Sequence, residues 1–208
     1  IENINRTLLS YSREIAGNRC YVAGDVTTSG QFVTADGGYT YEDAYEMYRE
    51  QIGILADAGA DLIVAETMIN IEETLAAVDA ANSVCSLPVM CTVTVEADGS
   101  IFSDGNAIEA VSALEGAGAD AVGINCSVGP DQLVSVVRSI REAVSIPVIA
   151  KPNAGMPVID DQGNAVYSMT SSDFARHMKA LVDAGAVLVG GCCGTTPEFI
   201  RALSGIIS

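Results

Sequence analysis

One short pattern recurs three times along the chain and constrains the fold more than any other feature. In each copy the end of a helix runs through a turn of two small residues around a glycine into a short apolar segment. The glycine suits the left-handed backbone that ends a helix before a strand. Further apolar segments separate the copies, so the pattern falls on every second strand and predicts a (β/α)8 barrel. The three copies are 55–66 (LADAGADLIVAE), 114–125 (LEGAGADAVGIN) and 181–191 (LVDAGAVLVGG).

Hydrophobic periodicity alternates between helical stretches and short apolar runs, which is typical of βα units around a parallel sheet. Most runs are apolar throughout, as expected for strands covered on both faces. Six strands are two fewer than a barrel needs, so the first one or two βα units are expected to be missing. We treat residues 1–208 as one domain. The predicted strands are 19–25, 62–66, 88–95, 121–126, 147–152 and 187–191, and the predicted helices are 4–16, 41–57, 71–83, 106–115, 130–144, 171–183 and 197–207.

An open, doubly wound sheet is the alternative α/β architecture. That fold typically places a glycine-rich phosphate loop after its first strand. Residues 23–30 read AGDVTTSG, which is not such a loop. The barrel is therefore the favoured prediction.

Composition narrows the class of partner. The formal net charge is −17 with only ten Lys and Arg residues, which argues against nucleic acid because phosphate binding relies on clustered positive charge. No apolar run approaches the roughly 20 residues of a membrane span, and no secretory signal is visible. We therefore expect a cytoplasmic protein with no membrane partner.

The six cysteines fall into two groups. Without a signal peptide they are expected to be thiols, metal ligands or core residues rather than disulfides. Cys20, Cys85 and Cys91 lie in or beside apolar stretches and are predicted to be small buried side chains. The other three follow predicted strands: Cys126 in GINCS, and Cys192 with Cys193 in GGCCGT.

The second group of cysteines predicts a zinc site. A disulfide between neighbours such as Cys192 and Cys193 is strained, whereas two thiolates can share one metal, and Cys126 offers a third. Three sulfur ligands suit Zn²⁺, whose catalytic sites keep one position open. Buried core thiols or a structural zinc site are the alternatives. The chain's one histidine, His177, lies in mid-helix, so a Ser-His-Asp or Cys-His hydrolase has no base.

Polar residues at other strand ends are candidate substrate ligands. Glu66 closes a strand and is expected to bind a cation, although a carboxylate favoured by the dipole of the following helix is the alternative. Asp25 has a similar position and a weaker case. The segment 151–157 (KPNAGMP) predicts a turn. The Asn153 side-chain oxygen could fill the fourth zinc position when no thiol is bound.

Together these motifs resemble the homocysteine S-methyltransferase family, which includes the homocysteine module of cobalamin-dependent methionine synthase and the betaine-dependent enzymes. The resemblance covers essentially the whole chain and is strongest in AETM at 65–68, GINCSVGP at 123–130, KPNAGMP at 151–157 and GGCCGTTP at 190–197.

This resemblance implies a TIM barrel that forms methionine. It places Zn²⁺ on the catalytic Cys126, Cys192 and Cys193, with the homocysteine thiol as fourth ligand and Glu66 on the substrate ammonium. The methyl donor would be a methylcobalamin protein, betaine or S-methylmethionine. The chain departs from the family at 25–28, where DVTT replaces a common Gly-Pro, and in lacking the Asp-Gly motif of the first barrel strand.

Two other functions remain open on the sequence. One is a non-catalytic zinc or thiol sensor, which would have a closed site of four ligands. The other is an inactive fragment, because six of eight strands leave two exposed parallel edges.

Overall fold

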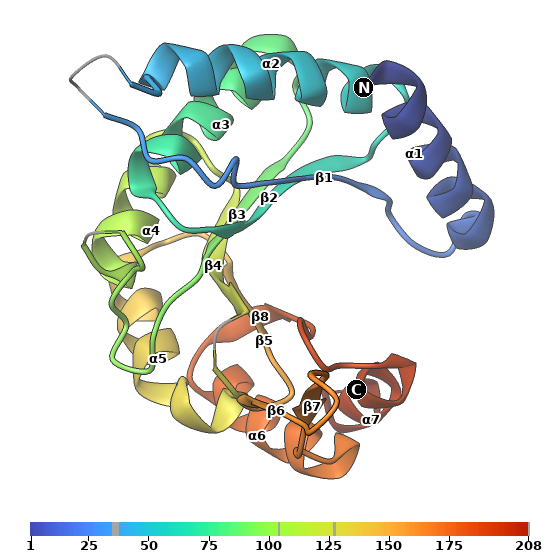
Figure 1. Cartoon of the computed structure of the whole chain (residues 1–208), viewed down its shortest axis with the longest axis vertical. Coiled ribbons are helices and arrows are strands. Elements are labelled where there is room, and N and C mark those ends of the chain that lie inside the picture. The colour runs from blue at the N-terminus through green and yellow to red at the C-terminus, as the bar shows by residue number, and fades with distance from the viewer. Residues whose placement is uncertain (35–37, 104, 127, 208) are drawn as a thin grey trace. The chain divides into compact units, whose positions relative to one another are not determined.

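The computed structural model describes residues 1–34, 38–103, 105–126 and 128–207, which alternate between helices and strands (Figure 1). The elements agree closely with the βα pattern of the sequence. The helices are α1 (Glu2–Ala16), α2 (Tyr41–Asp57), α3 (Ile71–Val84), α4 (Ala107–Gly116), η1 (Pro130–Gln132), α5 (Val134–Ala143), α6 (Ser171–Asp183) and α7 (Pro197–Ile207). The strands are β1 (Ala23–Thr27), β2 (Leu62–Met68), β3 (Val89–Val93), β4 (Ala121–Cys126), β5 (Val148–Pro152), β6 (Pro157–Ile159), β7 (Ala165–Tyr167) and β8 (Ala186–Val189).

The chain divides into two compact units, and the first comprises residues 1–92 with 113–121. Its strands lie in the order β1-β2-β3. β1 and β2 are parallel, with Asp25 opposite Val64 and Thr27 opposite Glu66. Paired positions of neighbouring strands share a face of the sheet, so Asp25, Thr27 and Glu66 lie on one face.

The second unit comprises residues 93–112 with 122–208. Here β4, β5 and β8 are neighbours in that order, and both pairs are parallel. α6 packs against α7 through Phe174 and Phe199, whose ring centroids are 5.4 Å apart in an edge-to-face arrangement. β6 and β7 form a separate antiparallel hairpin.

The glycines of the repeat adopt the conformation that the sequence predicts. Gly59, Gly118 and Gly185 have φ values of 93°, 95° and 117°, so each ends its helix in a left-handed turn. In the first two copies an aspartate follows and binds the start of the neighbouring strand. Asp61 accepts a 2.6 Å hydrogen bond from the Val22 amide, and Asp120 accepts one of 2.8 Å from the Val89 amide. In these two copies the glycine ends a helix, and the aspartate that follows fixes the start of a neighbouring strand.

Polar caps fix where the helices begin. The Thr40 hydroxyl accepts a hydrogen bond from the Asp43 amide, and the Asp43 carboxylate accepts from the Thr40 amide in return. Asn70 caps α3 through a 2.8 Å bond from the Glu73 amide, and Thr170 caps α6. Each cap lies in a loop after a strand, so the loops that carry candidate site residues are tied to the helices that follow.

The fold class is confirmed as α/β with parallel strands. Within each unit the strand order follows the sequence without the reversal that an open doubly wound sheet requires. The predicted helix 130–144 is instead a short 3-10 helix followed by α5, and the β6–β7 hairpin was not predicted.

The prediction that Cys20, Cys85 and Cys91 are buried is partly wrong. The predicted strand 19–25 begins only at Ala23, so Cys20 lies in the preceding loop and is exposed. Cys91 lies within β3 and is buried as predicted, while Cys85 is half-buried at the end of α3.

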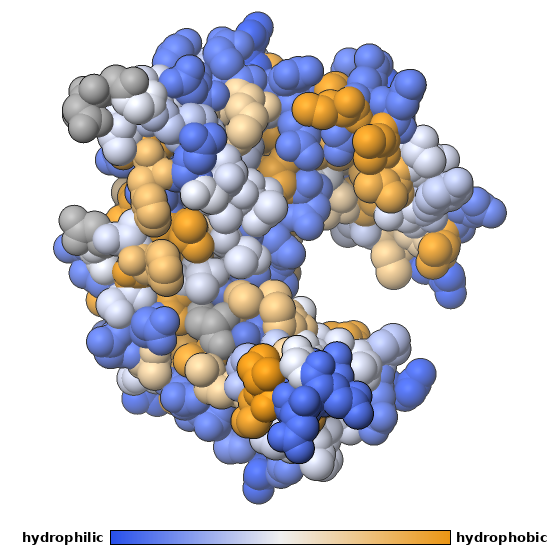
Figure 2. Space-filling model, viewed as in Figure 1, coloured by the Kyte–Doolittle hydropathy of each residue, from blue (hydrophilic) through white to orange (hydrophobic). Residues whose placement is uncertain are grey.

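α1 carries an apolar stripe that the first unit does not cover. Ile4, Leu8, Tyr11 and Ile15 recur at helical spacing, and each exposes at least 59% of its surface. Figure 2 shows hydrophobic side chains, in orange, exposed over α1 at the upper right. Such a stripe is typical of a helix face that packs against another element. Among the described residues, no helix combines the length and apolar character that a bilayer crossing needs.

Replacing Gly123 with alanine tests the close contact of β4 with β5. A Cβ atom at Gly123 would lie 2.0 Å from the Ile149 carbonyl oxygen, and neither backbone can move without disturbing the sheet. We expect Gly123→Ala to lower the free energy of unfolding by about 3 kcal/mol or more. Gly53→Ala is the control, because Gly53 lies in the interior of α2 with no atom within 4 Å. There alanine should stabilise by about 0.5–1 kcal/mol. Urea unfolding measures both, and equal effects would contradict the packing described.

Candidate metal and substrate site

The three predicted zinc ligands come together in the second unit. The sulfur atoms of Cys126, Cys192 and Cys193 all lie within 4.8 Å of one another, and no other group of three potential ligands is found among the residues that the structure describes. The Cys126 and Cys193 sulfurs are 3.8 Å apart. Cys126 ends β4, and the adjacent pair follows β8.

This spacing fits zinc. Two sulfurs that each lie about 2.3 Å from a tetrahedral zinc are about 3.8 Å apart. The Cys126–Cys193 pair already has that separation. Cys192 and Cys126 are half-buried and Cys193 is exposed, which leaves one side of the cluster accessible. The donor set is therefore suitable for a zinc ion with one open position.

Backbone hydrogen bonds to the end of β5 hold the cysteine pair in place. The Cys192 amide donates to the Pro152 carbonyl at 2.9 Å, and the Ala154 amide donates to the Cys193 carbonyl at the same distance. The motif KPNAGMP thus packs alongside GGCCGTTP, because β5 and β8 are parallel neighbours. Backbone hydrogen bonds thus join the two motifs beside the thiols.

Two buried asparagines complete this support. The Asn153 side-chain oxygen accepts a 3.0 Å hydrogen bond from the Cys193 amide, and Asn153 is 4% exposed. Asn125 precedes Cys126, and its amide nitrogen lies 3.7 Å from the Cys192 sulfur as a donor. The oxygen of Asn153 therefore positions a cysteine in this structure, and its role as a fourth zinc ligand stays a prediction.

Backbone conformation and close contacts explain why glycines lie beside the thiols. Cys126 has a φ of 65°, in the left-handed region that is uncommon for a side chain other than glycine and is often found at functional sites. Gly194 has a φ of 79°, and a Cβ there would meet the Tyr167 ring at 2.3 Å. Gly191 is needed for a different reason, since its Cβ would meet the Thr195 side chain at 2.5 Å.

Tyr167 is a site residue that the sequence reasoning missed. It ends β7, and its ring packs on Gly194, beside the cysteine pair. Burial, the charge of Cys193 and a hydrogen bond to it raise the pKa of Tyr167. A tyrosine four residues before a helix carries no local signal for this contact, which arises only when the hairpin forms.

The electrostatics of the thiols favour a cation. A hydrogen bond with Cys126, burial, and the charge of Cys126 raise the pKa of the Cys192 thiol. Like charges so close together cannot all ionise unless a positive charge compensates them. A divalent metal would provide that charge.

The two predicted carboxylate ligands, Asp25 and Glu66, belong to the first unit. Asp25 is exposed on β1, and Glu66 is half-buried on β2. The Thr27 hydroxyl donates to the Glu66 carbonyl at 2.8 Å. Glu66 lies five residues before α3, whose first turn contains Glu72 and Glu73 instead. The alternative of a helix-dipole carboxylate therefore does not apply to Glu66.

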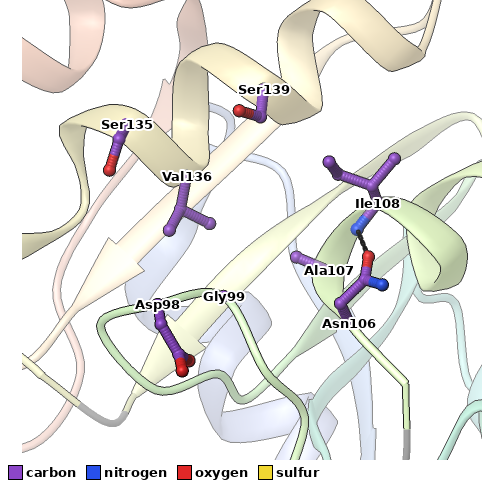
Figure 3. A pocket seen from close by; sticks show the side chains of 8 residues that line it. All are labelled: Asp98, Gly99, Asn106, Ala107, Ile108, Ser135, Val136 and Ser139. Carbon is purple, nitrogen blue, oxygen red and sulfur yellow. Dashed lines mark hydrogen bonds between the residues drawn. The ribbon is translucent and has the colours of Figure 1, made fainter.

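Two other features of the second unit lie apart from the thiol chemistry. His177 is half-buried within α6, as expected for a packing residue. A pocket of about 410 Å³ lies between α5 and the loop before α4, but it contains none of the cysteines (Figure 3). Two of its polar side chains are used structurally, since Asn106 caps α4 and Asp98 accepts hydrogen bonds from Ser100.

Solved structures share this fold. The apo form of the homocysteine methyltransferase MmuM from Escherichia coli matches with a TM-score of 0.76 and 23% identity, over 99% of this chain and 76% of that one. The metallated form of the same enzyme matches with a TM-score of 0.79 and 22% identity, over 98% of this chain and 70% of that one. The chain thus has most of the fold of those structures.

Curated relatives are similar in sequence. Methionine synthases of Mycobacterium leprae and Mycobacterium tuberculosis are each 32% identical over 195 residues, which is 90% of this chain and 16% of each synthase. Homocysteine S-methyltransferase 2 of Zea mays is 32% identical over 188 residues, which is 88% of this chain and 54% of the maize enzyme. The family model for homocysteine S-methyltransferase matches residues 1–207. The chain therefore belongs to the homocysteine S-methyltransferase family.

Proposed function

We propose that this protein binds Zn²⁺ through Cys126, Cys192 and Cys193 and transfers a methyl group to the thiol of homocysteine, which forms methionine. The observation that carries the proposal is the approach of the three sulfurs to within 4.8 Å in a member of this family. Bound zinc would lower the pKa of the substrate thiol, so that a nucleophilic thiolate exists at neutral pH.

The chain's own residues have distinct roles in this proposal. The three cysteines hold the metal and leave one position for the substrate sulfur. Asn153 and Asn125 orient Cys193 and Cys192 through the hydrogen bonds described above. Glu66 binds the substrate ammonium and Asp25 assists it, because carboxylates on one sheet face suit a cationic group.

The methyl donor is proposed to be methylcobalamin carried by another protein module. Two of the relatives at 32% identity are methionine synthases, of which this chain spans only 16%. Betaine and S-methylmethionine are the alternatives. Assaying methionine formation with each donor in turn distinguishes the three.

Replacing single cysteines tests the metal site. Cys126→Ser, Cys192→Ser or Cys193→Ser removes one sulfur from a three-sulfur site and should weaken zinc binding at least about 100-fold, since serine is a poor zinc ligand. Competition with a chromogenic zinc chelator measures the affinity. Cys20→Ser is the matched control, because Cys20 is exposed and lies in the other unit. If all four variants bind zinc like the wild type, the metal is held elsewhere.

A second prediction concerns Glu66 and uses substrate selectivity. Glu66→Gln keeps the side-chain size but removes the charge that is proposed to bind the ammonium. We expect KM for homocysteine to rise about 10- to 100-fold. KM for desamino-homocysteine, which has the thiol without the amino group, should stay within about 2-fold of wild type. An equal change for both thiols would assign Glu66 a structural role instead.

A further inference from the structure

A buried carboxylate in the first unit takes no part in the function proposed so far. Glu73 lies in the first turn of α3 and has no exposed surface. Its two oxygens accept three hydrogen bonds: 2.6 Å from the Thr28 hydroxyl, 2.7 Å from the Ser29 amide and 3.0 Å from the Tyr48 hydroxyl. A carboxylate is costly to bury, and this one is fully engaged with the loop after β1 and with α2.

Tyr48 extends these contacts to the end of β1. It is 1% exposed in α2, and its hydroxyl lies 3.0 Å from both the Thr27 carbonyl and Glu73. Burial, the negative charge of Glu73 and the hydrogen bond to it raise the pKa of Tyr48, which therefore remains a donor at neutral pH. Glu73 thus holds Thr28 and Ser29, and the single Tyr48 hydroxyl proton is shared between Glu73 and the Thr27 carbonyl.

The same loop contacts the proposed ammonium ligand. The Thr27 hydroxyl donates to the Glu66 carbonyl at 2.8 Å, and Thr27 lies opposite Glu66 in the sheet. The next residue, Thr67, has a φ of 57°, which is strained for a β-branched side chain. A strained backbone persists only where its surroundings hold it. The hydrogen bond from Thr27 holds the peptide group between Glu66 and Thr67.

We propose that Glu73 is a positioning residue that, with Tyr48, anchors residues 27–29 and thereby sets the orientation of Glu66 toward the amino group of the substrate. The inference rests on the proposed function, because it assigns Glu73 a part in binding the amino-acid end of homocysteine. Residues 25–28 read DVTT at this point. The second threonine of that segment, Thr28, donates the side-chain hydrogen bond to Glu73 that holds the loop.

The variants are chosen to separate hydrogen bonding from charge and from folding. Glu73→Leu keeps the volume and removes every acceptor, whereas Glu73→Gln retains one oxygen for Ser29 and Tyr48. Tyr48→Phe removes only the hydroxyl and provides a milder test should the leucine variant fold poorly. Glu72→Leu is the matched control, since Glu72 lies in the same helix turn but is exposed.

Steady-state kinetics with the zinc-loaded full chain are the main measurement. We expect Glu73→Leu to raise KM for homocysteine about 10-fold or more with kcat within about 3-fold, as for a lost binding contact. Tyr48→Phe should act in the same direction to a smaller extent, Glu73→Gln should restore most of the affinity, and Glu72→Leu should match the wild type. KM for desamino-homocysteine should not change in any of them.

Amide hydrogen exchange provides a readout that is independent of activity. Exchange at Ser29 should speed up in Glu73→Leu, while zinc content stays equal to that of the wild type. Unchanged homocysteine KM in both Glu73→Leu and Tyr48→Phe would overturn the inference and leave the proposed function standing. Equal losses for both thiols would also overturn it, since they would indicate general destabilisation. A wild-type protein that does not bind homocysteine would overturn both proposals.

Discussion

Mutual repulsion of closely spaced thiolates is the constraint on which the site depends. Three sulfurs within 4.8 Å of one another cannot all carry charge unless a cation lies among them. The protein nevertheless brings them together by backbone hydrogen bonds from the end of β5 to the Cys192–Cys193 segment. Parallel pairing of β4, β5 and β8 places the three loops at one edge of the sheet. The arrangement of thiols in the second unit is therefore suited to a metal ion.

The first unit contains carboxylates in two different environments. Asp25 and Glu66 lie on one face of β1 and β2, where they remain accessible. Glu73 is buried and satisfied instead, and it holds the loop that contacts Glu66. Accessible acids therefore serve as candidate ligands, and the buried acid supports them.

The sequence predicts most of the fold because periodicity and glycine positions are local signals. The three glycines of the repeat end their helices as expected. Cys20 was misplaced because the apolar residues around it continue the strand pattern into a loop that precedes Ala23. The β6–β7 hairpin was missed because its strands have three residues each, too few for a periodic signal.

The candidate site was predictable only in part. Adjacent cysteines between glycines indicate a metal, so the three candidate ligands that the structure brings together follow from the motifs. Tyr167 and Glu73 could not be found in the same way, because their roles depend on contacts across 26 and 45 residues, with Cys193 and with Thr28. A glutamate in the first turn of a helix usually caps or faces solvent, and nothing in its spacing distinguishes a buried one.

Zinc-edge X-ray absorption before and after the addition of homocysteine tests the central claim most directly. The account predicts three sulfur neighbours at about 2.3 Å in the substrate-free protein and four after homocysteine is added. A closed site whose sulfur count does not change with homocysteine would contradict it and would indicate a structural or sensing metal centre.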